Sequence, residues 1–149
     1  MRPSRRGLST ASIFATLRIV QERFFTVQEA NELIPFLSER LTELRAVHHK
    51  LRLLGANNPE SQEVALRGGV PVPPFYLALL TRLQCVVQDI CSEGCHLKDI
   101  ESGLVDFPTI WEGREVYLCW KFGETEVGHW HELEAGFAGR RSLECEPET

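Results

Sequence analysis

The first half of the chain carries hydrophobic residues at alternating spacings of four and three, which is the seam of a heptad helix. Its members are Ala30, Ile34, Leu37, Leu41, Leu44, Leu51 and one polar exception, His48. Thr26 and Glu29 at its start have the capping-box pattern, in which each side chain accepts the other residue's backbone N–H. The same spacing of hydrophobic residues continues between Pro73 and Gly94. Proline suits the first turn of a helix, and glycine suits its end. We therefore expect two long helices that pack as an antiparallel hairpin.

After Cys95 the spacing changes to two, the period of a β-strand. Short strands are expected at residues 97–100 and 104–107, the second of them stopped by Pro108. Together with the strands that follow, they predict an α+β fold. It consists of a long antiparallel helical hairpin packed on a small antiparallel sheet of three to four strands.

The clearest strand signal runs over residues 115–122, where apolar and polar side chains alternate. One face carries Val116, Leu118, Trp120 and Phe122, and the other carries Glu115, Tyr117, Cys119 and Lys121. Glu112-Gly113 immediately before this strand is the signal of a tight turn. Residues 127–131 are expected to return as the next strand.

Composition narrows the class of protein. Of 149 residues, 43% are hydrophobic and 25% charged, which fits a globular domain and excludes a disordered chain. The net charge of −5 argues against general nucleic-acid binding. No apolar run approaches the roughly 20 residues that a membrane span needs. The 5 cysteines have no dense or regular spacing, which favours a reduced, cytoplasmic protein over a disulfide framework.

Charge is divided unevenly along the chain. Residues 1–23 contain 5 arginines and 1 glutamate, a charge of +4, so the remainder carries −9 of the total of −5. We interpret residues 1–23 as a basic tail outside the fold; a misassigned start and a targeting segment are the other interpretations. The single domain then covers residues 24–143, and residues 144–149 form an acidic tail.

Two histidines supply the strongest hint of chemistry. His129 and His131 on one strand would place both imidazoles on one face, about 6–7 Å apart, a spacing that metal sites use. The register of the hairpin decides which face this is. If residues 123–126 are all loop, the histidines share the apolar face with Trp120 and are structural. If the pairing slips by one residue, they join Cys119 on the polar face, where a site can form.

Other candidate functional residues surround this pair. Asp106 interrupts an apolar run, so its carboxylate must be hydrogen-bonded, exposed or functional. Glu124 could supply a second carboxylate near His131, and Trp130 is an anchor for a core or an interface. Residues 136–141, with two glycines and two arginines, resemble an anion-binding loop only loosely. The sequence contains no strong catalytic motif, and the cofactor stays open.

Several short motifs occur in sequence along the chain: Phe25-Thr26 with Glu29-Ala30-Asn31, Gly103-Leu104-Val105-Asp106-Phe107-Pro108, Leu118-Cys119-Trp120, Gly123-Glu124, Trp130-His131 and Gly136-Phe137. In their order and spacing they resemble the family called domain of unknown function 2203. The resemblance covers about residues 24–143 and implies a small bacterial protein with no established activity. The family pattern includes His131, whereas His129 is not a clear part of it.

Three hypotheses follow. The first is a non-enzymatic interaction or scaffold protein whose coiled-coil hairpin forms a homodimer or binds a protein partner, since helices of about 40 and 30 Å outreach so small a sheet. The second is a metal-binding protein or metal-assisted enzyme that uses His131, His129, Asp106 and Glu124. The third is a small-ligand module whose pocket is lined by Trp120 and Trp130.

Overall fold

The computed structural model describes residues 23–56 and 73–145; of the expected tails at residues 1–23 and 144–149, residues 1–22 and 146–149 lie outside this range. Two helices, α2 (Val27–Ala56) and α4 (Pro74–Ser92), come first. Five strands follow: β1 (His96–Asp99), β2 (Leu104–Trp111), β3 (Arg114–Lys121), β4 (His129–His131) and β5 (Arg141–Ser142). Two 3-10 turns, η1 (Phe137–Gly139) and η2 (Leu143–Cys145), flank β5. The α+β class is confirmed, but the sheet has five strands and not three to four.

The first helix begins with the predicted capping box. The Thr26 N–H donates to Glu29 Oε2 at 2.8 Å, and the Glu29 N–H donates to Thr26 Oγ1 at 3.1 Å. The α2 helix then continues without a break through Pro35. Most of the predicted seam is buried, although Val47 takes the buried position near its end and His48 is only half-buried.

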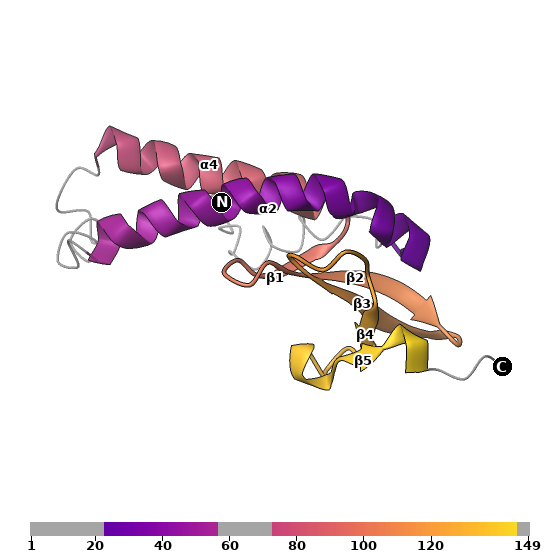
Figure 1. Cartoon of the computed structure of the whole chain (residues 1–149). Helices are drawn as coiled ribbons and strands as arrows, with labels where there is room; N and C mark the ends of the chain where they lie inside the picture. The colour runs from indigo at the N-terminus through magenta and orange to yellow at the C-terminus, as the bar shows by residue number, and fades with distance from the viewer. Residues whose placement is uncertain (1–22, 57–72, 146–149) are drawn as a thin grey trace, which may run out of the picture.

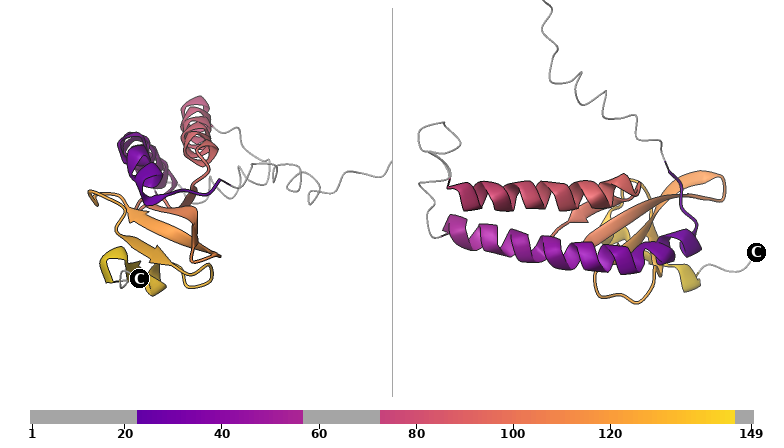
Figure 2. Two further views of the ribbon diagram at one scale, coloured as in Figure 1. Left: turned by 90° about the vertical axis from the view of Figure 1, so that its right-hand side faces the viewer. Right: turned by 90° about the horizontal axis from the view of Figure 1, so that it is seen from above.

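Helices α2 and α4 lie side by side and antiparallel, as the sequence predicts (Figures 1 and 2). Arg82 on α4 binds Glu43 on α2, and Arg40 bridges Glu43 at 3.3 Å and Asp89 at 3.8 Å. The connected ends of both helices extend beyond the sheet, as the right-hand view of Figure 2 shows. No helix among the described residues is long and apolar enough to cross a membrane.

The sheet is an antiparallel meander in the order β1-β2-β3-β4-β5. Strands β2 and β3 are joined by the predicted two-residue turn, in which Glu112 has φ 49° and Gly113 has φ 77°. Positive φ at both positions is the type I′ geometry, which matches the twist of the flanking strands. The β2–β3 hairpin is the longest pair of strands in the described sheet. It supplies most of the apolar side chains on the face toward the helices.

Pro108 does not end the second strand, contrary to the prediction, because β2 runs on to Trp111. Strand β1 pairs with β2 only as far as Asp106, so Pro108 lies on an open edge. Its missing N–H therefore costs no ladder hydrogen bond. The Pro108 carbonyl accepts the Phe25 N–H at 2.8 Å, so the segment before α2 covers this part of the edge.

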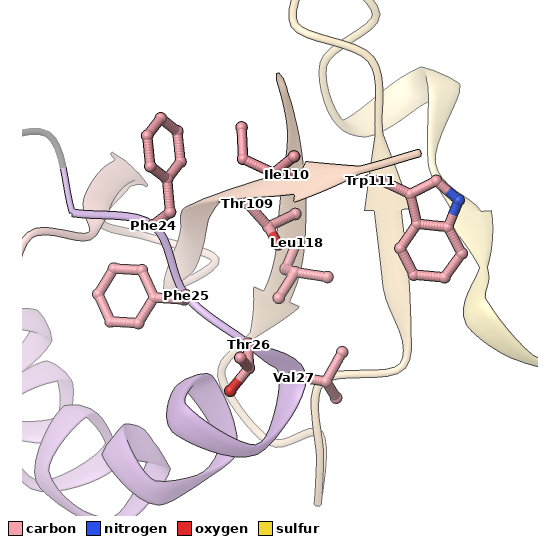
Figure 3. A pocket seen from close by; sticks show the side chains of 8 residues that line it. All are labelled: Phe24, Phe25, Thr26, Val27, Thr109, Ile110, Trp111 and Leu118. Atoms are coloured by element: carbon pink, nitrogen blue, oxygen red, sulfur yellow. The ribbon is translucent and has the colours of Figure 1, made fainter. Parts of the chain in front are cut away.

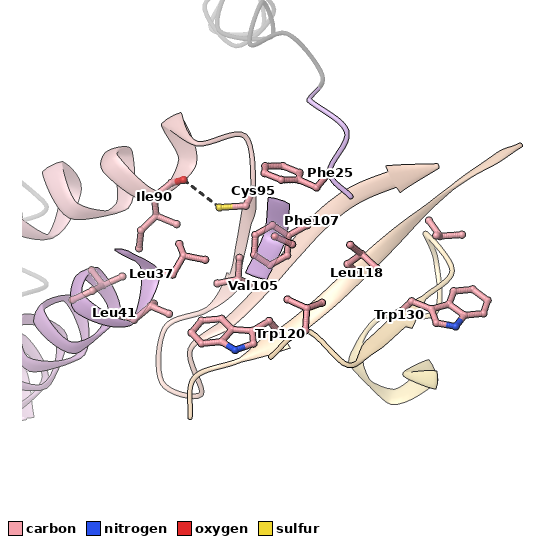
Figure 4. Close-up of a cluster of buried hydrophobic side chains, with 14 of the residues drawn as sticks. Phe25, Leu37, Leu41, Ile90, Cys95, Val105, Phe107, Leu118, Trp120 and Trp130 are labelled. Carbon is pink, nitrogen blue, oxygen red and sulfur yellow. Dashed lines mark hydrogen bonds between the residues drawn. The ribbon is translucent and has the colours of Figure 1, made fainter. Parts of the chain in front are cut away.

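The hydrophobic core lies between the helical hairpin and one face of the sheet (Figure 4). The helices contribute Leu37 and Leu41 of α2 and Ile90 of α4, all completely buried. The sheet contributes Val105, Phe107, Val116, Leu118 and Trp120. Phe25 packs edge-on against Phe107 with ring centroids 5.2 Å apart. The segment that follows β4 lies on the side of the sheet away from the helices (Figures 1 and 2).

The pairing of β3 with β4 follows the slipped register, which brings Tyr117 opposite His131 and Cys119 opposite His129. The returning strand is shorter than predicted and begins only at His129. Val127 is excluded from it because it is buried and its N–H donates to Asn31 Oδ1 of α2 at 2.7 Å. The resulting connection places both histidines on the face opposite the helices.

Candidate metal centre

A row of polar and ionisable side chains crosses all five strands of the described sheet. In strand order its members are His96, Asp106, Cys119, His129 and Ser142. Directly paired residues of antiparallel strands project from the same face, with Cβ atoms about 4.5–5.5 Å apart. The row therefore lies on the face that the helical hairpin does not cover.

His131 stands beside this row and is buried together with Asp106. Each side chain is only 2% exposed. The Tyr117 ring, opposite His131 in the ladder, lies 5.5 Å from the His131 ring and 5.5 Å from the His96 ring. Two ionisable groups are thus withdrawn from water on a face that has no helical cover, which requires that they satisfy each other.

The hydrogen bonds of His131 determine where its ring carries a proton. Nδ1 lies 2.7 Å from the Glu132 carbonyl oxygen, which can only accept, so Nδ1 carries the hydrogen and donates it. Nε2 lies 3.0 Å from Asp106 Oδ2. In a neutral ring, the Nε2 lone pair then faces a carboxylate oxygen, and two acceptors would repel. The pair is complete only with a positive centre between these atoms, either one proton or a metal ion.

Cys119 completes the cluster. One ligand atom each from Asp106, Cys119 and His131 lie within 4.8 Å of one another, and all three residues are buried. Zinc bonds of about 2.0–2.3 Å in tetrahedral geometry separate ligand atoms by roughly 3.3–3.6 Å. Small side-chain movements would therefore be enough to close these three residues around an ion.

Burial raises the pKa of the Cys119 thiol to about 12, and the negative charge of Asp106 adds to this rise. The opposing charge of Arg140 lowers the pKa of this thiol, but by less. A thiol of this kind is a poor nucleophile at neutral pH, because the thiolate is the reactive form. A coordinated cation would remove its proton outright. The cluster is suited to metal binding rather than to thiol catalysis.

Glu124 lies near the cluster but has other partners. Arg140 Nη2 donates to both of its carboxylate oxygens, at 2.6 and 2.5 Å, and the Lys121 N–H donates to Oε2 at 2.9 Å. Burial raises the pKa of Glu124. These hydrogen bonds and the charge of Arg140 together lower it by more, so the pKa lies below its ordinary value. Glu124 is thus an anion held by Arg140 and is not one of the three clustered ligands.

The other sequence candidates are placed apart from the cluster. His129 shares the row, yet its ring nitrogens are not among the three clustered ligand atoms; its Nδ1 is buried without a hydrogen-bond partner in the described residues. Trp130 points to the opposite face, where its ring stacks on Trp111 with centroids 6.1 Å apart. The structure therefore brings together Asp106 and His131 from the predicted set.

Two hollows in the described surface do not include the cluster. One, of about 340 Å³, lies at the open edge of β2 between Phe24, Ile110 and Trp111 (Figure 3). The other, of about 430 Å³, lies on α2 beside Arg45, His48, His49, Arg52 and Glu101. Neither is lined by Trp120 or Trp130, so neither is the pocket that the third sequence hypothesis described.

Sequence reasoning assigned no role to Cys119 or Arg140. The slipped register named Cys119 as a neighbour of the histidines, so the alternation of β3 contained a signal for it. Arg140 follows η1, and its guanidinium contacts were not visible from the weak glycine-arginine pattern of residues 136–141.

Comparison with protein-family models matches residues 23–143 to a family described as "Uncharacterized conserved protein (DUF2203)". No curated protein and no solved structure matches the chain. The match has nearly the same boundaries as the resemblance in the sequence, and it includes the three clustered residues.

Proposed function

The chain belongs to the DUF2203 family of uncharacterized conserved proteins. We propose that it binds one divalent transition-metal ion, with zinc as the preferred metal. The ligands are the Asp106 carboxylate, the Cys119 thiolate and Nε2 of His131. Three protein ligands leave one coordination position of a four-coordinate ion open, and metal-assisted chemistry would take place at that open position.

The observation that carries this proposal is the arrangement of hydrogen bonds at His131. Metal-binding histidines donate their second ring N–H to a carbonyl or carboxylate, which fixes the tautomer and aims the free nitrogen at the ion. His131 does so through Nδ1 and the Glu132 carbonyl, at 2.7 Å. Its Nε2 then faces an anionic oxygen at 3.0 Å with no proton of its own in the neutral ring.

The charges also favour a divalent ion. A carboxylate and a thiolate together carry two negative charges, which a divalent ion cancels, so the loaded site is neutral. A buried site without net charge avoids the desolvation penalty of an uncompensated ion. One sulfur, one nitrogen and one oxygen ligand suit zinc better than calcium or magnesium, which prefer oxygen alone.

The first test is elemental analysis of the full chain, purified without an affinity tag and without added metal. We expect one zinc or another transition-metal ion per chain, lost in His131→Ala and in Cys119→Ser. His49→Ala and Cys85→Ser are the matched controls, since both residues are exposed and far along the sequence from the cluster; they should keep the metal.

Protein without metal is then titrated with zinc. Saturable binding at one ion per chain that is lost in the two cluster variants would support the site. Equal binding by the cluster variants and their controls, or none by the unaltered chain, would refute it.

A second candidate function is self-association through the helical hairpin. Phe75 and Leu77 of α4 are 57% and 50% exposed, and Leu53 of α2 is 52% exposed. We propose a homodimer in which this end of the hairpin packs against the same end of its copy. Light scattering should give twice the chain mass for the unaltered protein and the single mass for Phe75→Glu with Leu77→Glu. Leu133→Glu, at an exposed apolar position that follows β4, should stay dimeric. A monomer at tens of micromolar would exclude this function.

A further inference from the structure

The proposed ion leaves one buried donor near the cluster unexplained. Asp106 Oδ1 and Arg140 Nε are both buried without a hydrogen-bond partner in the described part of the chain. A cation bound by both oxygens of the Asp106 carboxylate would take the lone pair of Oδ1. It cannot satisfy Arg140 Nε, which is a donor and needs an acceptor. An acceptor from outside the protein, placed beside the ion, would satisfy it.

The sheet places Arg140 next to a proposed metal ligand. Strands β4 and β5 pair His129 with Ser142 and Trp130 with Arg141. The pairing ends at Arg141, and the alternation of side chains along the chain puts the preceding residue, Arg140, toward the face that carries the cluster. The charge of Arg140 also acts on the Cys119 thiol, so its guanidinium lies near the proposed ion.

The guanidinium of Arg140 is also held in place. Its Nη2 is bound to both oxygens of Glu124, and its side chain is only 13% exposed. The Arg140 guanidinium lies over the Phe137 ring at 5.1 Å, which restricts it from another side. Nε is therefore a fixed, buried and unused donor.

We propose that the metal site takes a small carboxylate as its exchangeable ligand, with one oxygen on the ion and the other accepting the N–H of Arg140 Nε. This inference rests on the proposed metal site. Three protein ligands leave one position of a tetrahedral ion open. The open position on the ion can bind one oxygen, and the N–H of Arg140 Nε can bind a second. A carboxylate has two oxygens, so it matches both. A phosphate would leave further charged oxygens without donors.

The test uses the full chain loaded with cobalt(II), whose visible spectrum reports its ligands, and acetate as the probe. Acetate should change the spectrum saturably. In Arg140→Lys, which keeps a cation for Glu124 but removes Nε, acetate affinity should fall about tenfold to hundredfold, the effect of one charge-assisted hydrogen bond. Arg141→Gln is the matched control and should leave it unchanged, because that guanidinium lies over the Trp130 ring on the other face.

The outcomes separate the two proposals. Failure to bind cobalt at all refutes the metal site and this inference with it. Cobalt binding without an acetate effect, or with the same acetate affinity in Arg140→Lys, overturns the inference and leaves the metal site standing. Circular dichroism confirms that Arg140→Lys is folded. Inorganic phosphate serves as the competing probe, and tighter binding of phosphate than of acetate would overturn the carboxylate assignment.

Discussion

Replacing Asp106 by Asn separates a metal ligand from a purely structural hydrogen bond. In the metal-free protein, the Asn amide can donate to Nε2 of neutral His131, so the 3.0 Å contact keeps a hydrogen bond. The free energy of unfolding without metal should then change by only about 1 kcal/mol. The neutral amide is a much poorer ligand for a cation than the carboxylate, so metal binding should suffer far more.

The size of the effect on zinc binding can be estimated. Loss of a partner that merely orients a ligand costs about 10–100-fold in metal affinity, so loss of the ligand itself should cost at least about 100-fold. Zinc at 100 times its dissociation constant stabilises the unaltered protein by about 2.7 kcal/mol. At the same concentration Asp106→Asn would gain only about 0.4 kcal/mol. For a domain of this size these values correspond to increases in Tm of about 10 °C and about 1–2 °C.

Thermal unfolding followed by circular dichroism, with and without zinc, measures both quantities. Asp89→Asn is the control, because Asp89 is half-exposed on α4 and should keep the full increase in Tm. An equal increase in Asp106→Asn and in the unaltered chain would refute the assignment of Asp106 as a ligand. A fall of 3–5 kcal/mol without metal, the typical result of breaking a buried ion pair, would show instead that the proton-bridged pair is the native state.

Three further predictions concern other parts of the molecule. A thiol reagent should modify exposed Cys85 at once and Cys95 slowly, because burial raises the Cys95 pKa to about 12; equal rates would contradict this. Glu124→Gln should lower stability at pH 7 by about 1–2 kcal/mol. The lowered Glu124 pKa confines this loss to pH values above its folded-state pKa, so denaturant melts of variant and parent should converge in acid. Gly103→Ala should cost about 2–4 kcal/mol in urea unfolding, because its Cβ would lie 2.5 Å from Phe122 Cβ at φ +66°, whereas Gly113→Ala, with open space, should cost about 1–2 kcal/mol.

Local signals account for the parts of the fold that could be predicted. The Thr26–Glu29 capping box and the Glu112-Gly113 turn each depend on residues close in sequence, and both are present in the structure. The fifth strand could not be predicted because it has only two residues and exists through its pairing with β4. Pro108 misled the prediction because its cost depends on whether a neighbouring strand lies beside it, which local sequence does not contain.

The candidate site depends on contacts between residues far apart in the sequence. The hydrogen bond from the Val127 N–H to Asn31 joins residues 96 positions apart and holds the connection before His129 against α2. The strand that follows pairs in the slipped register, which places His131 with Asp106 and Cys119. The alternation of β3 leaves two faces possible for the histidines, and local sequence does not contain the contacts that decide between them.

The open edge of β2 has a consequence for how the protein behaves at high concentration. An exposed strand edge is a template on which other chains can add strands and aggregate. Here Pro108 offers no donor, and its carbonyl is already occupied by the Phe25 N–H. The proline and the segment before α2 together act as a gatekeeper against fibrillar growth from this edge. Removing Phe24 and Phe25 would uncover this strand end and leave its carbonyl open to pairing with another chain.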